Sequence, residues 1–291
     1  MDRFDGTAYR RLLPVGRRGV LLEVRQPDRR PRLEVVLRGE EARSEPARAA
    51  ALRVLEISLG AGLDVRPFYR AFRDDPLLSG ALRHSRGLRI AGTPSLWEGI
   101  VTAVLSQQIN LAFAYDIRRE LSIALGRRVR FDGETWFDFP RPSRVALETE
   151  RSLRKFRLSR AKAGTILRTA KAFASREISE TDVASLPDEE AIARLTSIKG
   201  IGRWTAEIAL LRGLGRADVF PGADLGVVKY VAMQLLGHRA RVTEETMRRF
   251  ADRWRPYRGL ALVYAYAEIN RRAEERRQVV GSDRKSRGGE S

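Results

Sequence analysis

The chain has no cysteine among its 291 residues. Disulfides, a thiolate nucleophile and a cysteine-bound zinc or iron–sulfur cluster are therefore excluded. The only two histidines, His84 and His238, are isolated and do not have the spacing of metal ligands. No apolar run approaches the roughly 20 residues that a membrane helix needs, and the N-terminus has no apolar signal region. We therefore expect a cytosolic protein with no membrane partner.

Lysine is scarce as well, with six residues against 49 arginines, yet the net charge is +18 and the pI is about 11.1. A GC-rich genome explains much of the preference for arginine over lysine, but it does not explain the excess of cations over acids. A chain this basic should bind polyanions through counterion release. Because no strongly amphipathic anchor helix is evident, nucleic acid is favoured over an anionic membrane.

The first forty residues have the composition of a small β-sheet. Three segments are rich in leucine or β-branched residues and are predicted to be strands: Ala8–Leu13, Gly19–Arg25 and Arg32–Leu37. Turns that contain proline and glycine separate them. A helix is predicted to begin near Glu45, and helical spacing of apolar residues then dominates. The predicted fold class is mainly α with a small N-terminal antiparallel β-sheet (α+β).

The most informative stretch runs from Leu195 to Asp224. Gly200 and Gly202 permit a tight turn between two helices while their amides stay free, and the second helix presents its positive end to solvent. These features make an anion site suited to one phosphate, with added charge from Lys199 and Arg203. An ordinary helix–turn–helix connection would also place glycine at this point, so the glycines alone leave both interpretations open.

A single carboxylate, Asp224, follows in a loop with Pro221 and Gly222. Cleavage of an N-glycosidic bond builds positive charge on the sugar, and a carboxylate can stabilise that charge or orient the attacking water. Aspartate is also a favoured N-cap, so Asp224 can begin the next helix instead, and the two roles are compatible. Asp218 is a competitor for the catalytic role, but its position favours a role in the turn.

The segment LTSIKGIGRWTAEIALLRGLGRADVFPGADLGVVKY, residues 195–230, resembles the signature of the helix-hairpin-helix DNA glycosylase superfamily. The match is closest to the 3-methyladenine DNA glycosylase II branch, and it extends upstream to Trp97–Asn110 and downstream to Trp254–Arg258. The resemblance implies a bilobal, all-helical core with the active cleft between its lobes. We expect an N-terminal domain over 1–88, this core over 89–275 with the hairpin at about 188–214, and a disordered basic tail over 276–291.

The resemblance implies a base-excision-repair enzyme that flips an alkylated purine, such as 3-methyladenine, out of duplex DNA and hydrolyses its N-glycosidic bond, with Asp224 as the catalytic residue. Bifunctional members carry a lysine where this chain has Trp204, so a monofunctional enzyme is expected. Trp204 and Tyr257 would form the base pocket, and an indole face adds a cation–π contribution of about 1–2 kcal/mol with a cationic base. The alternative is that both aromatic residues are core residues.

Gln107 and Gln108 interrupt an apolar helix where the resemblance places the DNA wedge. Apolar wedges are usual, so Gln108 is a departure from the pattern, and a solvated helix end terminated by Asn110 is the alternative. A second departure is Gly259, where the family often has serine after the arginine.

The expected partner is double-stranded DNA that contains damaged bases, bound by a monomer in the cytoplasm of a bacterium, in association with the nucleoid. No cofactor is required, and a monovalent cation held by the hairpin carbonyls is left open. Two alternatives remain: a non-catalytic helix-hairpin-helix DNA-binding protein, and a glycosylase for another lesion such as hypoxanthine or oxidised guanine.

Overall fold

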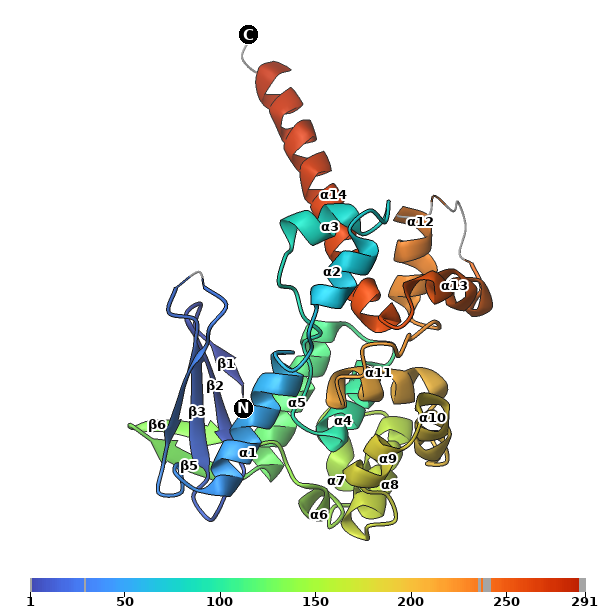
Figure 1. The fold of residues 1–291 in the computed structure, drawn as a ribbon. Helices are drawn as coiled ribbons and strands as arrows, with labels where there is room; N and C mark the ends of the chain where they lie inside the picture. The colour runs from blue at the N-terminus through green and yellow to red at the C-terminus, as the bar shows by residue number, and fades with distance from the viewer. Residues whose placement is uncertain (1, 29, 235–236, 238–241, 288–291) are drawn as a thin grey trace. The chain divides into compact units, whose positions relative to one another are not determined.

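A computed structural model describes residues 2–28, 30–234, 237 and 242–287. The chain forms two compact units, which we call unit 1 (residues 1–59 and 92–214) and unit 2 (residues 60–91 and 215–291). Figure 1 labels most of their helices and strands. Within the described part of the chain, no helix combines the length and apolar character that a membrane span requires.

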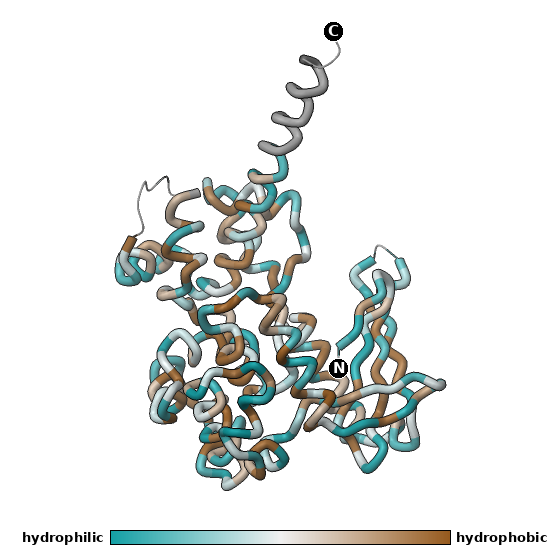
Figure 2. Tube along the Cα trace, turned by 180° about the vertical axis from the view of Figure 1, so that it is seen from behind, coloured by the Kyte–Doolittle hydropathy of each residue, from teal (hydrophilic) through white to brown (hydrophobic). Residues whose placement is uncertain are grey.

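The sheet of unit 1 is antiparallel, with strand order β1 (Arg3–Phe4), β2 (Ala8–Leu13), β3 (Val20–Arg25) and β4 (Glu34–Arg38). Successive side chains point to opposite faces of a strand, so each face buries its own apolar set. Leu13 and Leu22 pack on one face against the helix α1 (Glu45–Arg53), while Leu12 and Leu21 pack on the other. Hydrophobic and hydrophilic stretches accordingly both occur along these strands (Figure 2). The predicted sheet and its helix are confirmed.

The second face of the sheet packs against a β-hairpin that we did not predict. Strands β5 (Arg128–Phe131) and β6 (Glu134–Phe137) pair antiparallel, and Trp136 packs with Leu12 and Leu21. The turn residues Asp132 and Gly133 have φ angles of +50° and +80°. The prediction of an all-helical core over 89–275 was therefore wrong at this point. The Asp-Gly pair between two alternating segments is a strong hairpin signal in the sequence.

The rest of unit 1 is helical. Besides α1, its helices are η1 (Val54–Ser58, π-helical), α4 (Leu96–Ser106), α5 (Leu111–Leu125), α6 (Pro142–Val145), α7 (Glu150–Arg154), α8 (Arg160–Ala174), α9 (Glu180–Ser185), α10 (Asp188–Thr196) and α11 (Arg203–Gly213). Helix α4 is buried along nearly its whole length and packs against α5, α8 and α11. It therefore forms the centre of the unit.

A buried charge network attaches the sheet to these helices. Glu98 of α4 accepts hydrogen bonds from Arg11 of β2 and from Arg118 of α5, and Asp2 pairs with both arginines. All four side chains are at most about a quarter exposed. Buried charges persist only when they are paired, so this network fixes the sheet to the helical part of unit 1.

Unit 2 is helical in its described residues. Its helices are α2 (Arg66–Phe72), α3 (Ser79–His84), η2 (Gly226–Val231, π-helical), α12 (Ala232–Gln234), α13 (Glu244–Ala251), η3 (Asp252–Trp254, 3₁₀) and α14 (Arg258–Arg287). Phe68 of α2 packs its ring against Tyr257 and Tyr264, with ring centroids 5.7 and 5.2 Å apart. The core of unit 2 thus joins segments nearly 200 residues apart in the chain.

The two units divide the chain differently from the predicted domains. Because Phe68 packs on Tyr264, α2 and α3 belong with the C-terminal helices, and the Arg11–Glu98 pair places the sheet with the central helices. The predicted tail over 276–291 also differs, since α14 continues to Arg287. Ion pairs of the i,i+3 and i,i+4 type, such as Glu268–Arg271, support this helix. Residues 288–291 lie outside the described residues.

Candidate active site

The hairpin between α10 and α11 is built on a glycine that no other residue can replace without strain. Gly200 has a φ of +101°, and a Cβ atom there would lie 2.0 Å from Thr165 Oγ1. The turn closes with a hydrogen bond of 3.0 Å from the Ile201 amide to the Ile198 carbonyl. The buried side chains Ile198 and Ile201 anchor both sides of the turn. Gly200 is therefore required for the close packing of the turn onto α8.

Gly202 has the opposite environment. It is the N-cap of α11, makes no side-chain cap, and a Cβ atom added to it would meet no atom within 4 Å. The first amides of a helix lack intrahelical partners and carry the positive end of the helix dipole. Gly202 therefore leaves the N-terminus of this eleven-residue helix open to an anion from solvent, which fits the predicted phosphate cradle.

Arg203 is held within the hairpin. Its guanidinium donates two hydrogen bonds of 2.6 and 2.8 Å to Glu189 of α10 and one of 2.9 Å to the buried Glu207 of α11. The hydrogen bond with Glu189 raises the pKa of Arg203. The side chain that we predicted to contact DNA phosphate therefore also fastens the two helices of the hairpin together.

Lys199 extends from the exposed side of the turn, and its backbone carbonyl accepts a hydrogen bond of 2.9 Å from Arg168 of α8. One hairpin carbonyl is therefore already occupied by a guanidinium. Among the described residues there is no group of three or more histidine, cysteine or acidic side chains suited to a metal ion.

The two predicted wedge residues differ in their surroundings. Gln107 turns back into the protein, where its Nε2 donates to Thr205 Oγ1 over 2.9 Å. Gln108 is exposed and has a φ of +54°, which places it at the outer point of the turn between α4 and α5. Asn110 caps α5 through a 2.7 Å hydrogen bond from the Ala112 amide. Gln108 is therefore the accessible candidate for the wedge, and Gln107 anchors the turn.

Lys162 of α8 forms hydrogen bonds with the backbone at the start of this turn. Its Nζ donates hydrogen bonds of 2.8 Å to the carbonyls of Leu105 and Gln107 at the C-terminal end of α4. Burial lowers the pKa of the Lys162 ammonium. A cation at a helix C-terminus also complements the helix dipole, so Lys162 stabilises the end of α4 in two ways.

Asp224 begins the helical segment that contains η2. Its Oδ1 accepts a 2.8 Å hydrogen bond from the Gly226 amide and a 3.2 Å hydrogen bond from the Tyr266 hydroxyl of α14. The side chain is half-buried. The predicted capping contact is confirmed, and the loop Phe220–Asp224 together with α14 fixes the position of the carboxylate.

Asp218, the competing carboxylate, serves the start of α14. It accepts hydrogen bonds from the backbone amide and the guanidinium of Arg258, at 3.1 Å and at 2.9–3.0 Å respectively. Asp218 therefore has a structural role, but at the start of α14, 40 residues along the chain, and not in the local turn that we predicted.

The two predicted pocket aromatics belong to different units. Trp204 lies half-buried in the first turn of α11 in unit 1, next to the hairpin glycines, and Tyr257 lies half-buried against Phe68 in unit 2. Unit 1 therefore contains the hairpin, Trp204 and the turn over residues 107–110, which we call the wedge turn after its predicted role, and unit 2 contains Asp224 and Tyr257.

The sequence profile of the HhH-GPD superfamily of base excision DNA repair proteins matches residues 101–256. The chain belongs to this superfamily. The matched segment contains the wedge turn, the hairpin and Asp224, and it confirms the resemblance found in the sequence. The chain is accordingly a DNA glycosylase of the base excision repair pathway.

Three relatives show how far the similarity extends. The DNA-3-methyladenine glycosylase of Bacillus subtilis is 32% identical over 203 residues, which cover 70% of this chain and 67% of the relative. DNA-3-methyladenine glycosylase 2 of Escherichia coli is 28% identical over 229 residues, covering 74% and 77%. The solved structure of the 3-methyladenine DNA glycosylase of Archaeoglobus fulgidus superposes with a TM-score of 0.79 at 28% identity, covering 92% of this chain and 89% of the other.

Four residues that contact the candidate site residues were not singled out from the sequence. Tyr266 lies in an apolar helix, where its spacing indicates only core packing. Lys162 was given no functional role from the sequence, although lysine is scarce in this arginine-rich chain. Thr205 and Gly226 carry no sequence signal, because their roles come from contacts with Gln107 and Tyr266.

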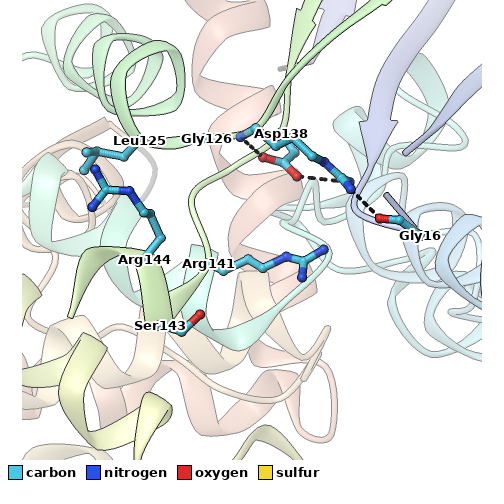
Figure 3. Close-up of a pocket in the computed structure, with 8 residues that line it drawn as sticks. Gly16, Leu125, Gly126, Asp138, Arg141, Ser143 and Arg144 are labelled. Atoms are coloured by element: carbon cyan, nitrogen blue, oxygen red, sulfur yellow. Dashed lines mark hydrogen bonds and ion pairs between the residues drawn. The ribbon is translucent and has the colours of Figure 1, made fainter. Parts of the chain in front are cut away.

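A cavity of about 390 Å³ lies elsewhere in unit 1, between the end of α5 and α6 (Figure 3). Its arginines already have partners within the protein: Arg127 contacts Asp138 and the Gly16 carbonyl, Arg141 the Pro14 carbonyl, and Arg144 the Glu148 carboxylate. The contacts of Arg127 and Arg141 join the β2–β3 turn to the segments around α6, so we assign the arginines of this cavity a structural role.

Proposed function

We propose that this glycosylase excises alkylated purines of the 3-methyladenine type from duplex DNA by a monofunctional mechanism. The observation that carries the proposal is Asp224, whose Oδ1 is hydrogen-bonded to Gly226 and Tyr266 in the segment that follows the hairpin. The naming of the Bacillus subtilis and Escherichia coli relatives as 3-methyladenine glycosylases supports this choice of substrate.

In the proposed reaction the damaged nucleotide rotates out of the helix and its base leaves as positive charge develops on the sugar. Asp224 stabilises that charge electrostatically or orients the attacking water. An alkylated purine is already a good leaving group, so no general acid is needed. Trp204 occupies the position of the lysine in bifunctional members, which supports hydrolysis without strand cleavage.

The proposed DNA contacts are of three kinds. Lys199, Gly200, Gly202 and Arg203 bind one phosphate at the hairpin, and Gln108 fills the gap that the flipped nucleotide leaves. Trp204, in the first turn of α11, stacks on the flipped base. The protein acts as a monomer and requires no cofactor, and a monovalent cation at the hairpin would add to the phosphate contact.

The test is base release from methylated duplex DNA by the wild type, by Asp224→Asn and by Asp218→Asn as the matched control, with DNA binding followed in parallel. We expect Asp224→Asn to bind DNA but release no base, and Asp218→Asn to retain release. Binding without release by the wild type, across a panel of methylated, deaminated and oxidised bases, would contradict the proposal and favour a non-catalytic DNA-binding protein.

A further inference from the structure

One face of α8 supports both turns that the proposed function places against DNA. Lys162, Thr165 and Arg168 follow one another at intervals of three residues, so each lies next to the preceding one on the helix surface. Lys162 contacts the wedge turn, while Thr165 and Arg168 contact the hairpin turn. At a rise of about 1.5 Å per residue, the six steps from Lys162 to Arg168 span roughly 9 Å.

At the first end of this span, Lys162 provides the partner for two backbone carbonyls. The last carbonyls of a helix have no intrahelical donor, and here Nζ satisfies those of Leu105 and Gln107 at 2.8 Å each. The hydrogen bonds from Lys162 therefore fix the backbone at Gln107, where the wedge turn begins. The exposed Gln108 is the next residue.

At the other end, α8 supports the hairpin through direct contact. The Thr165 hydroxyl lies 2.0 Å from the position that a Cβ of Gly200 would take, and Arg168 Nε donates to the Lys199 carbonyl at 2.9 Å. The bond between Gln107 Nε2 and Thr205 Oγ1 ties the wedge turn to α11 directly. The wedge turn and the hairpin are thus joined twice, once through α8 and once through this bond.

We propose that the Lys162 face of α8 sets the spacing between the DNA wedge and the phosphate cradle, and that Lys162 is a positioning residue for base flipping. The inference rests on the proposed function, because it takes the Gln108 turn as the wedge. Flipping requires a base to be unstacked, and a wedge already held in its working position does not have to be ordered at that moment. Glutamine has several rotatable bonds, so a rigid backbone matters more here than for a compact apolar wedge.

The experiment compares Lys162→Met with Lys171→Met in the full-length protein. Lys171 is an exposed lysine of the same helix, so its substitution removes the same charge and leaves the wedge turn intact. Single-turnover base release is measured on two duplexes, with the damaged base either paired or opposite a mismatch. Flipping costs least for a mismatched base. We expect Lys162→Met to slow release from the paired duplex at least tenfold and from the mismatched duplex by less than threefold.

The control variant should match the wild type on both duplexes, and both variants should bind undamaged DNA equally. An equal defect of Lys162→Met on the two duplexes would overturn the proposal, because a general structural loss does not depend on the pairing of the base. Wild-type rates for Lys162→Met would overturn it as well.

Two further variants separate positioning from folding. Lys162→Arg retains a cationic donor for the two carbonyls and should restore most of the rate on paired DNA. Thr205→Val removes only the partner of Gln107 and should give a smaller defect with the same preference for mismatched DNA. If the wild type releases no base from either duplex, the proposed function itself fails, which is a different result from a wild-type enzyme that is insensitive to Lys162.

Discussion

The Tyr266 hydroxyl lies 3.2 Å from Asp224 Oδ1, and the carboxylate oxygen that it contacts also accepts the Gly226 amide. The contact between the Tyr266 hydroxyl and the Asp224 carboxylate requires a residue without a side chain at position 226. A Cβ on Gly226 would lie 2.3 Å from the Tyr266 hydroxyl and 2.9 Å from Asp224 Oδ1. Glycine at 226 therefore allows α14 to approach the carboxylate and to fix its orientation.

We expect Tyr266→Phe to slow base release without weakening DNA binding, because the Asp224 carboxylate loses one of its hydrogen bonds. A hydrogen bond to a charged group contributes about 1.5–3 kcal/mol, so a decrease of roughly tenfold or more in the single-turnover rate is expected. Tyr264→Phe is the matched control, since Tyr264 lies in the same helix and bonds to Tyr69 and the Leu88 carbonyl instead. Equal effects of the two substitutions would argue against a positioning role for Tyr266.

The two hairpin glycines should respond differently to alanine. Gly200→Ala combines a positive φ with a close contact to Thr165, so it should destabilise the protein by about 1–3 kcal/mol and lower its melting temperature. Gly202→Ala meets open space and should fold normally, yet weaken DNA binding, because its methyl group occupies the approach to the α11 amides. Thermal melts and binding titrations check this, and the prediction fails if Gly202→Ala binds DNA like the wild type.

Lys199 and Arg203 should also separate into binding and stability effects. Lys199→Gln is expected to leave stability unchanged and to reduce the slope of log K against log salt by about 0.9, as for one lost phosphate contact. Arg203→Gln should in addition lower the melting temperature, since it breaks the contacts with Glu189 and Glu207. Salt titrations and melts of both variants test this, and equal melting temperatures would show that the Arg203 contacts do not stabilise the hairpin.

The charge network at Asp2 predicts how stability depends on pH. Burial raises the pKa of Asp2, but the charges of Arg11 and Arg118 lower it more, so the pKa lies well below its ordinary value of 3.8. A carboxylate with a depressed pKa stabilises the fold above its ordinary pKa, and this contribution is lost as the pH falls below that value.

Asp2→Asn should therefore destabilise the protein by about 1–3 kcal/mol at pH 7, less than for a fully buried pair because Asp2 is 27% exposed. The difference between the free energies of unfolding of the variant and the wild type should become smaller as the pH falls from 5 towards 3. Urea unfolding at several pH values measures it. A difference that stays constant with pH would mean that the charge of Asp2 is not its source.

The sequence predicted those parts of the fold in which local chemistry and tertiary structure agree. The strand Ala8–Leu13 and the helix start at Glu45 were placed correctly, because alternation and turn residues mark the strand. The hairpin was predicted because Gly200 and Gly202 lie between two helical segments, and because Asp224 follows them as in the glycosylase superfamily that the chain resembles.

The remaining features depend on contacts between distant residues. Nothing near Phe68 indicates that it packs on Tyr264, so the grouping of 60–91 with the C-terminal helices could not be predicted. In the same way, the role of Gln107 depends on Thr205, and that of Tyr266 on Asp224. The hairpin β5–β6 is different: its Asp132–Gly133 turn was a readable signal that we did not use.

The discontinuity of unit 2 has a consequence for synthesis on the ribosome. Unit 1 has all its residues once the chain has grown to Leu214, but α2 and α3 emerge long before the C-terminal helices against which they pack. Phe68 and Phe72 are both buried in the folded protein. On the ribosome their side chains stay exposed until the C-terminal helices have been translated, more than a hundred residues later. The nascent chain should be most prone to aggregation, and most dependent on chaperones, during this interval.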